Sequence, residues 1–194
     1  MIRVYENALP PNPLVSELAA KRGLHPVELM IELALERDSK QFFQSFVSSP
    51  NEDTLLEVMR HPRTIMTFSD SGAHVSQIVD SCIQTHLLAY WALRRLAFSL
   101  EEAVRMITLA PARVWGLHER GLLREGMIVN INIFDPKTLS PGLPELAHDL
   151  PSGARRLKMK ATGFLATIVA GEVVLENGQH TGKLPGRLLR RGHH

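Results

Sequence analysis

Apolar residues recur at helical spacing through the first part of the chain. This spacing predicts helices over residues 14–22, 26–37 and 51–59. Gly23 marks the end of the first helix, because glycine readily adopts the left-handed conformation that follows many helices. Asn51 can cap the third helix, since its side chain accepts a hydrogen bond from a backbone N–H group of the first turn. The first part of the chain is therefore predicted to be mostly helical.

Two more helices are predicted in the middle of the chain. Residues 85–97 have helical apolar spacing. Ser99 opens the sequence Ser-Leu-Glu-Glu, a capping box at the start of a helix that runs to about Leu109. Pro111 then breaks or restarts the helical path, because proline has no backbone N–H group to donate.

Strand patterns occupy the beginning and the end of the chain. Residues 1–5 are short and strand-like. Residues 128–134 alternate between apolar and polar, as in a half-exposed strand. Residues 164–170 and 172–176 flank a turn with glycine, and Asn177-Gly178 is a second turn signal. The end of the chain is therefore predicted to hold a hairpin or a larger sheet.

Residues 63–74 form the most informative stretch, with the sequence Arg-Thr-Ile-Met-Thr-Phe-Ser-Asp-Ser-Gly-Ala-His. Residues 64–68 are apolar or β-branched and follow a proline, which favours a buried strand over a helix. The turn at 69–72 would end this strand and place Asp70 at its carboxyl end, where barrel enzymes carry functional side chains. Asp70 is therefore the leading candidate. The alternative is that Asp70 only orders the turn through its own backbone hydrogen bonds.

The composition fits an ordinary globular protein. The chain has 194 residues, of which 44% are hydrophobic, enough for a sizeable core. The formal net charge is +2. No nucleic-acid partner is predicted, because such a protein would normally show a strongly basic domain and a recognisable reading motif. No membrane association is predicted either, since no apolar run approaches the ~20 residues that a membrane span needs.

Cys82 is the single cysteine, so the chain can form neither an intrachain disulfide nor a cysteine metal cluster. It lacks a local motif for a nucleophile, and the expected role is that of a small buried residue. The amino terminus lacks the charged and apolar regions of a secretory signal. We therefore expect a cytoplasmic location.

Several motifs occur in an order that resembles the carboxyl-terminal part of an N-acyl-D-amino-acid deacylase, or D-aminoacylase, of the amidohydrolase superfamily. The longer motifs read HPRTIMTFSDSGAH at 61–74, SLEEAVRMITLAPAR at 99–113 and GLHERGLLREG at 116–126. Shorter matches follow at 134–136, 148–156 and 169–174. Each motif alone is weak, but their ordered succession is specific.

The resemblance implies an α/β fold made of the carboxyl-terminal portion of a metal-dependent (β/α) barrel and strands of a small β-sandwich. Residues 1–118 would be the last barrel units, and residues 119–194 the sandwich portion, with a long loop at about 136–156. The strands that complete the sandwich in full-length relatives would be absent, so the chain is expected to be a fragment. Relatives commonly read Ala-Asp-Leu where this chain has Val129-Asn130-Ile131, so a structural carboxylate is lost there.

The resemblance also implies an activity, the hydrolysis of N-acyl-D-amino acids to D-amino acids and carboxylates. This is the work of a zinc-dependent hydrolase of carbon–nitrogen bonds in linear amides. Asp70 would be the general acid/base and would also contact the metal. Ser71, Gly72 and His74 are candidate substrate contacts. The alternative for Gly72 is that it only allows the backbone to adopt a positive φ. The alternative for His74 is that it fixes its loop through hydrogen bonds to the backbone.

The other metal ligands of the family have no matching positions in this chain. The family uses a His-x-His pair, a bridging residue and two further histidines. The nine histidines here include no pair spaced as His-x-His. A catalytic zinc usually has three protein ligands, so a companion segment would have to supply most of them. The chain alone is therefore expected to be a poor catalyst.

Two interpretations remain open at this stage. In the first, the chain is part of a zinc-dependent deacylase that acts on a small-molecule N-acyl-amino acid. In the second, it is a non-catalytic amidohydrolase-like relic that acts as a binding or oligomerisation module, because strand edges left open can pair with another chain. A homo-oligomer in solution would favour the second interpretation.

Overall fold

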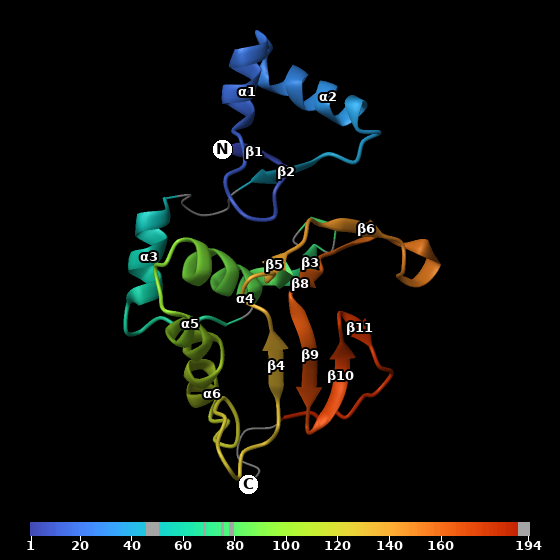
Figure 1. Cartoon of the computed structure of the whole chain (residues 1–194). Coiled ribbons are helices and arrows are strands. Elements are labelled where there is room, and N and C mark those ends of the chain that lie inside the picture. Colours follow the sequence, from blue (N-terminus) through green and yellow to red (C-terminus); the bar gives the residue numbers. More distant parts are fainter. Residues whose placement is uncertain (46–50, 68, 75, 78–79, 190–194) are drawn as a thin grey trace. The chain divides into compact units, whose positions relative to one another are not determined.

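The chain forms two compact units, Met1–Val58 and Met59–His194. A computed structural model describes residues 1–45, 51–67, 69–74, 76–77 and 80–189, without the side chains of residues 73 and 80. Figure 1 gives the order of the helices and strands. Each unit is described by itself below.

The first unit combines a two-stranded sheet with a pair of helices. Strand β1 (Ile2–Tyr5) pairs antiparallel with β2 (Phe42–Ser45). Helix α1 spans Val15–Arg22 and α2 spans Pro26–Glu36. Gly23 follows α1 with φ 69°, in the left-handed conformation. These observations confirm the first strand, both helices and the helix-ending glycine, whereas the sequence pattern did not indicate β2.

A small apolar core holds the first unit together. Val4 of β1 and Leu29 of α2 are both fully buried. They pack in one cluster with side chains from α1 and from the rest of α2, namely Val15, Ala19 and Leu33. Burying a side chain such as Leu29 contributes roughly 1.5–3 kcal/mol relative to leaving it exposed. The helical apolar spacing in the sequence therefore corresponds to the face that α1 and α2 turn toward this core.

Helix α3 (Glu52–Arg60) lies at the division between the two units. The Asn51 side-chain oxygen accepts hydrogen bonds from the backbone N–H groups of Asp53 and Thr54, at 2.9 and 3.2 Å. The predicted cap is therefore confirmed. Acidic residues in the first turn and Arg60 in the last turn complement the helix dipole.

The helices of the second unit begin with the 3-10 turn η1 (Asp80–Cys82) and α4 (Ile83–His86). The π-helix η2 (Leu87–Arg94) continues directly from α4. Together they confirm the helix predicted over 85–97 as far as Arg94, whereas residues 95–97 are not helical. Every residue from Leu87 to Ala92 is buried, so this short helix is apolar on all sides and forms the centre of the helical part.

Two further helices complete this part, α5 (Leu100–Ile107) and α6 (Leu109–Trp115). The Ser99 hydroxyl accepts a hydrogen bond from the Glu102 backbone N–H at 3.1 Å, as expected for the predicted start of α5. The chain bends at Thr108, and Pro111 falls in the first turn of α6. The helix restarts there because a proline near a helix start loses no hydrogen bond.

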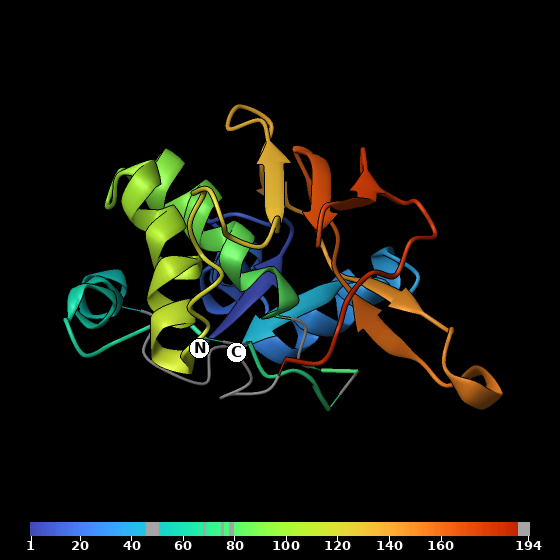
Figure 2. The same ribbon diagram turned by 90° about the horizontal axis from the view of Figure 1, so that it is seen from below.

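The predicted sheet at the end of the chain is confirmed. Four strands pair antiparallel in the order β11-β10-β9-β4. They span Gln179–His180 for β11, Glu172–Glu176 for β10, Phe164–Val169 for β9 and Ile131–Phe134 for β4. In both Figure 1 and Figure 2, α5, α6 and η2 lie to one side of this sheet. The unit therefore combines a helical part with a sheet part.

Tight turns connect the last three strands. Ala170 and Gly171 have positive φ, as do Asn177 and Gly178. This conformation suits two-residue hairpins, because its twist matches that of the flanking strands. The Asn130 side-chain oxygen accepts a hydrogen bond from the Ala170 backbone N–H at 2.9 Å. Asn130 therefore has a structural contact of its own.

The segment predicted as a loop over 136–156 contains short strands that the sequence pattern did not indicate. Strand β5 (Ser140–Pro141) pairs with β8 (Ala161–Thr162), and β6 (Glu145–Ala147) pairs with β7 (Arg156–Lys158). The 3-10 turn η3 (Pro151–Gly153) connects β6 to β7. The loop is therefore partly ordered into a hairpin.

The remaining strand, β3, spans Ser71–His74. The division at 58/59 does not test the predicted division into a barrel part, 1–118, and a sandwich part, 119–194, which stays a prediction. None of the helices in the described part of the chain combines the length and the apolar character needed to cross a lipid bilayer.

Candidate functional site

Asp70 lies immediately before strand β3, and its side chain is exposed. The strand predicted over 64–68 is wrong, because residues 64–67 have no regular secondary structure; residue 68 lies outside the described residues. The Thr64 backbone N–H donates to the His61 carbonyl at 3.0 Å, so a local turn takes up the beginning of the predicted strand. Asp70 therefore leads into a strand and does not follow one.

The backbone at this site adopts conformations that few side chains favour. The φ angle is 55° at Asp70, 98° at Gly72 and 49° at His74. Aspartate and histidine are among the residues that tolerate the left-handed region best. Two left-handed residues within five positions bend the chain sharply around β3, and such conformations are over-represented at functional sites.

The turn before β3 is ordered by Ser69. Its hydroxyl accepts a hydrogen bond from the Ser71 backbone N–H at 3.3 Å. Within the described residues, no hydrogen bond or ion pair engages the Asp70 carboxylate. Among these residues, no hydrogen bond from the Asp70 side chain supports the alternative that Asp70 only orders the turn. The carboxylate can therefore act on a ligand.

The candidate substrate contacts lie beside Asp70 in the chain. The Ser71 and His74 side chains are exposed, and Gly72 lies between them. The His74 carbonyl accepts a hydrogen bond from the Gln77 backbone N–H at 2.7 Å. This contact uses the backbone of His74, so it does not occupy the imidazole.

The described residues do not by themselves make up a complete metal site. Among them, no three histidine, cysteine, aspartate or glutamate side chains gather closely enough to hold a metal ion. Asp70 can offer one carboxylate, whereas a catalytic zinc usually has three protein ligands. Cys82 was expected to be buried, but it is half-buried, and it makes a contact of its own.

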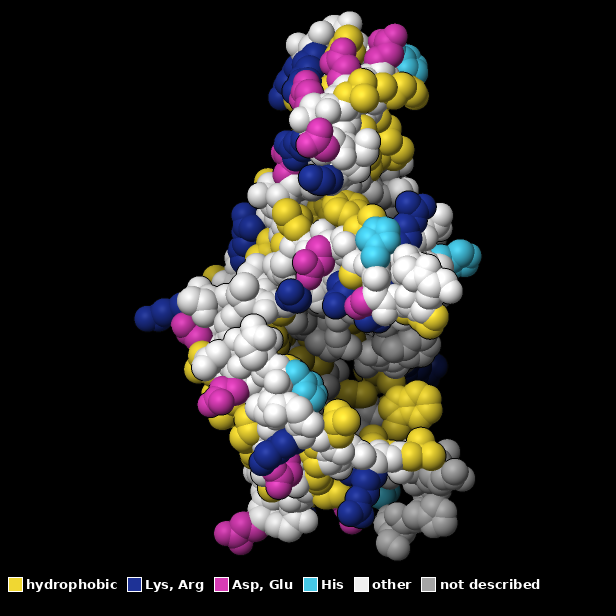
Figure 3. Space-filling model, turned by 90° about the vertical axis from the view of Figure 1, so that its right-hand side faces the viewer, with side chains coloured by type: hydrophobic (Ala, Val, Ile, Leu, Met, Phe, Trp, Pro, Cys, Tyr) yellow, Lys and Arg dark blue, Asp and Glu magenta, His cyan; other side chains and the backbone are white. Residues whose placement is uncertain are grey.

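Charged side chains of both signs are scattered over the face shown in Figure 3. The most connected group lies on the hairpin of β6 and β7, where Asp149 accepts hydrogen bonds from Arg156 at 2.7 and 2.9 Å and from Lys158 at 3.1 Å. The hydrogen bonds from Arg156, and then that from Lys158, hold the pKa of the Asp149 carboxyl well below its usual range. This group is exposed, and its role is to join the two strands of the hairpin.

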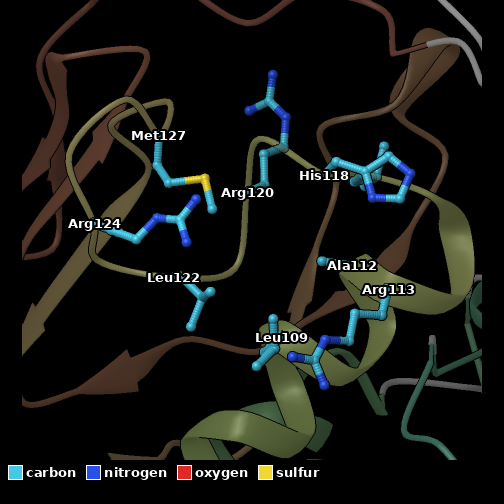
Figure 4. A pocket seen from close by; sticks show the side chains of 9 residues that line it. Leu109, Ala112, Arg113, His118, Arg120, Leu122, Arg124 and Met127 are labelled. Carbon is cyan, nitrogen blue, oxygen red and sulfur yellow. The ribbon is translucent and has the colours of Figure 1, made fainter.

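A hollow of about 210 Å³ lies between helix α6 and the segment that follows it. Figure 4 shows its side chains. Arginines at 113, 120 and 124 line it together with apolar residues, and none of them was a candidate from the sequence. The sequence pattern indicated a helix in residues 99–109 and a resemblance in residues 99–113 and 116–126, but no binding role for their arginines. The signal that could have indicated them is the recurrence of arginine within these motifs.

Comparison with known proteins identifies the family. The amidohydrolase family matches residues 4–175, which is most of the chain. No curated protein matches the sequence. The solved structures that match include D-aminoacylases, and the chain spans about a third of their length.

Three such structures show the extent of the similarity. An aspartate-to-alanine variant of D-aminoacylase in complex with 100 mM CuCl2 has 25% sequence identity and a TM-score of 0.58, over 93% of this chain and 35% of that one. A D-aminoacylase described as defining a novel subset of amidohydrolases has 25% identity and a TM-score of 0.54, over 87% and 32%. A D-aminoacylase studied for its binuclear metal centre has 24% identity and a TM-score of 0.54, over 89% and 33%.

These comparisons confirm the resemblance to D-aminoacylases that the motifs indicated. They also confirm the α/β class, because the family and the matched structures fit an α/β amidohydrolase-like fold. The family profile includes Asp70 and most of both units. The chain therefore belongs to the amidohydrolase family.

Proposed function

We propose that this chain is the carboxyl-terminal part of a hydrolase that converts N-acyl-D-amino acids to D-amino acids and carboxylates. The observation that carries the proposal is the match to D-aminoacylase structures over 87–93% of the chain. That match covers 32–35% of those structures. On this proposal, residues 1–118 belong to a (β/α) barrel and residues 119–194 to a β-sandwich, both completed by a companion segment.

Asp70 is the proposed general acid/base. A carboxylate at this position takes a proton from the attacking water and returns it to the leaving nitrogen, which otherwise departs as an unstable anion. Its exposure and the lack of a hydrogen bond to it among the described residues support this role, because a proton carrier must reach both water and substrate. The positive φ at Asp70 sets the direction in which its side chain leaves the backbone.

The proposal includes a zinc ion to which Asp70 contributes one ligand. One of the matched D-aminoacylases was studied for a binuclear metal centre. Because the described residues hold no group of three potential ligands, the remaining ligands are proposed to come from the companion segment. A metal ion in such a site would lower the pKa of bound water and polarise the amide carbonyl.

Ser71, Gly72 and His74 are proposed to contact the substrate. The Ser71 hydroxyl and the His74 imidazole are exposed and can each donate a hydrogen bond to a carboxylate, such as that of an N-acyl-amino acid. Gly72 leaves space beside them because it has no side chain.

The cytoplasmic location expected from the sequence also stays a prediction.

A second candidate function is a non-catalytic binding or oligomerisation module. It is favoured by β4, which pairs with β9 and, within the described residues, with no second strand. An edge strand of this kind can accept a strand from another chain. Size measurement in solution separates the two candidates, since a module that works by strand pairing forms an obligate oligomer.

Reconstitution tests the proposed function. The chain is co-expressed with a D-aminoacylase that lacks the third matching this chain, and zinc is added during expression. Hydrolysis of N-acetyl-D-amino acids and of their L-isomers is then measured. The proposal predicts that neither part alone is an efficient catalyst and that the pair hydrolyses the D-isomers. Zinc should be retained only by the pair. Efficient hydrolysis by the chain alone would contradict the need for a companion segment.

A further inference from the structure

The second unit contains a basic hollow that none of the roles described above uses. It is lined by Arg113 of helix α6 and by Arg120 and Arg124 of the following segment. Within the described residues, none of these three guanidinium groups has an ion pair. The acidic residues that lie nearest in sequence, Glu119 and Glu125, do not line the hollow. Three arginines therefore line the hollow, and no carboxylate among the lining residues balances their charge.

The rest of the lining is largely apolar. Leu109 lies on the side of α6, and Leu122 and Met127 lie on the side of the following segment. Figure 4 shows the side chains of Arg113 and Arg124 extending toward the hollow from these two sides, whereas the Arg120 side chain extends away from it. The hollow thus offers charged groups and apolar surface to the same occupant.

The segment that forms one wall is held firmly against the helix. An added Cβ at Gly121 would lie 3.0 Å from the Cβ of Ala112 and 3.0 Å from the Cα of Leu109, so the backbone at Gly121 packs directly on α6. The Ile128 backbone N–H donates to the Glu119 carbonyl at 3.0 Å and closes the segment on itself. A wall that is already ordered costs little further entropy when a ligand binds.

We propose that this hollow binds a small oxyanion that carries a short apolar group, such as a medium-chain carboxylate. The planar guanidinium groups of Arg113 and Arg124 suit a carboxylate, because they donate paired hydrogen bonds in a fixed geometry. Leu109, Leu122 and Met127 would cover the apolar group. The hollow has a volume of about 210 Å³, which leaves room for a ligand the size of hexanoate.

Isothermal titration of the whole chain with hexanoate tests the proposal. We expect saturable binding with one hexanoate per chain. Acetate should bind at least about tenfold more weakly, because it lacks the buried methylene groups. Hexylammonium, which has the same chain and the opposite charge, should not bind.

Two sets of variants locate the binding. The double variant Arg113→Gln/Arg124→Gln should weaken hexanoate binding at least about tenfold, because hydrogen bonds between charged groups are lost. Arg155→Gln removes an exposed arginine outside the hollow and should leave binding unchanged. Circular dichroism of each variant establishes that it is folded.

Several results would overturn the proposal. They are no saturable binding of hexanoate, equal binding of hexylammonium, unchanged binding by the folded double variant, or an equal loss in Arg155→Gln. None of these results depends on hydrolytic activity, so the test is independent of the proposed function.

Discussion

Replacing Gly121 by alanine probes the contact between helix α6 and the segment that follows it. Gly121 has φ +85°, and an added Cβ would lie 3.0 Å from the Ala112 Cβ, from the Leu109 Cα and from the Thr108 carbonyl oxygen. The left-handed conformation costs an alanine about 1–2 kcal/mol. Forcing a methyl group against packed atoms, two of them backbone, costs about 1–3 kcal/mol more. We expect Gly121→Ala to lower the free energy of unfolding by about 2–5 kcal/mol.

Gly126→Ala is the matched control. Gly126 has almost the same φ, +84°, but an added Cβ would meet nothing within 4 Å. It should therefore show only the conformational cost of about 1–2 kcal/mol. Urea unfolding followed by tryptophan fluorescence measures the difference, because both tryptophans, Trp91 and Trp115, belong to the second unit. An equal loss of stability in the two variants would refute the close packing of Gly121.

Two further predictions concern packing in the first unit and charge in the second. Leu29→Ala should lower the free energy of unfolding by about 2–5 kcal/mol, because Leu29 is fully buried. Leu35→Ala should lower it by less than ~0.5 kcal/mol, because the Leu35 side chain is 72% exposed. Similar urea midpoints for the two variants would contradict the assignment of Leu29 to the core. The lowered pKa of Asp149 means that its contribution to the β6–β7 hairpin is present above the ordinary pKa near 3.8 and is lost as the pH falls through the lower folded value. An NMR titration should show this low pKa rising in Arg156→Gln, and an ordinary pKa in the unaltered chain would contradict the pairing.

Helix ends and tight turns could be predicted from the sequence because they depend on local chemistry. Gly23 follows α1 in the left-handed conformation, and Asn51 caps α3 through two hydrogen bonds. Asn177 and Gly178 form the hairpin turn with positive φ at both positions. In each case the residue that makes the structure lies within a few positions of the groups that it contacts. No distant partner is needed to specify such features.

Strand positions were harder to predict because a strand is defined by its partner. The apolar run at 64–67 has no regular secondary structure, although its composition favours a strand. Conversely, β2 pairs with β1 across about 40 positions, and β5 ends in a proline that usually argues against a strand. The run at 64–67 is not buried either, since Thr64 and Thr67 are exposed and Ile65 and Met66 are half-buried.

The candidate site shows the same contrast. Asp70 could be found because it lies within a motif, although its place before a strand, and not after one, could not be predicted. Arg113, Arg120 and Arg124 are separated by seven and four positions, a spacing that suggests one face of a helix. The turn after α6 instead brings them around a hollow. Their positions around the hollow depend on the packing of Gly121 against α6. The hydrophobic periodicity of the sequence does not predict this packing.

The most direct test of the central claim compares Asp70→Asn with Asp38→Asn in the reconstituted enzyme. Both aspartates are exposed and have positive φ, so the two substitutions match in chemistry and conformation. We predict that Asp70→Asn lowers kcat for an N-acetyl-D-amino acid by about 10²–10⁴-fold, the usual contribution of a general acid/base, and that Asp38→Asn leaves it unchanged. Full activity of a folded Asp70→Asn enzyme would contradict the account.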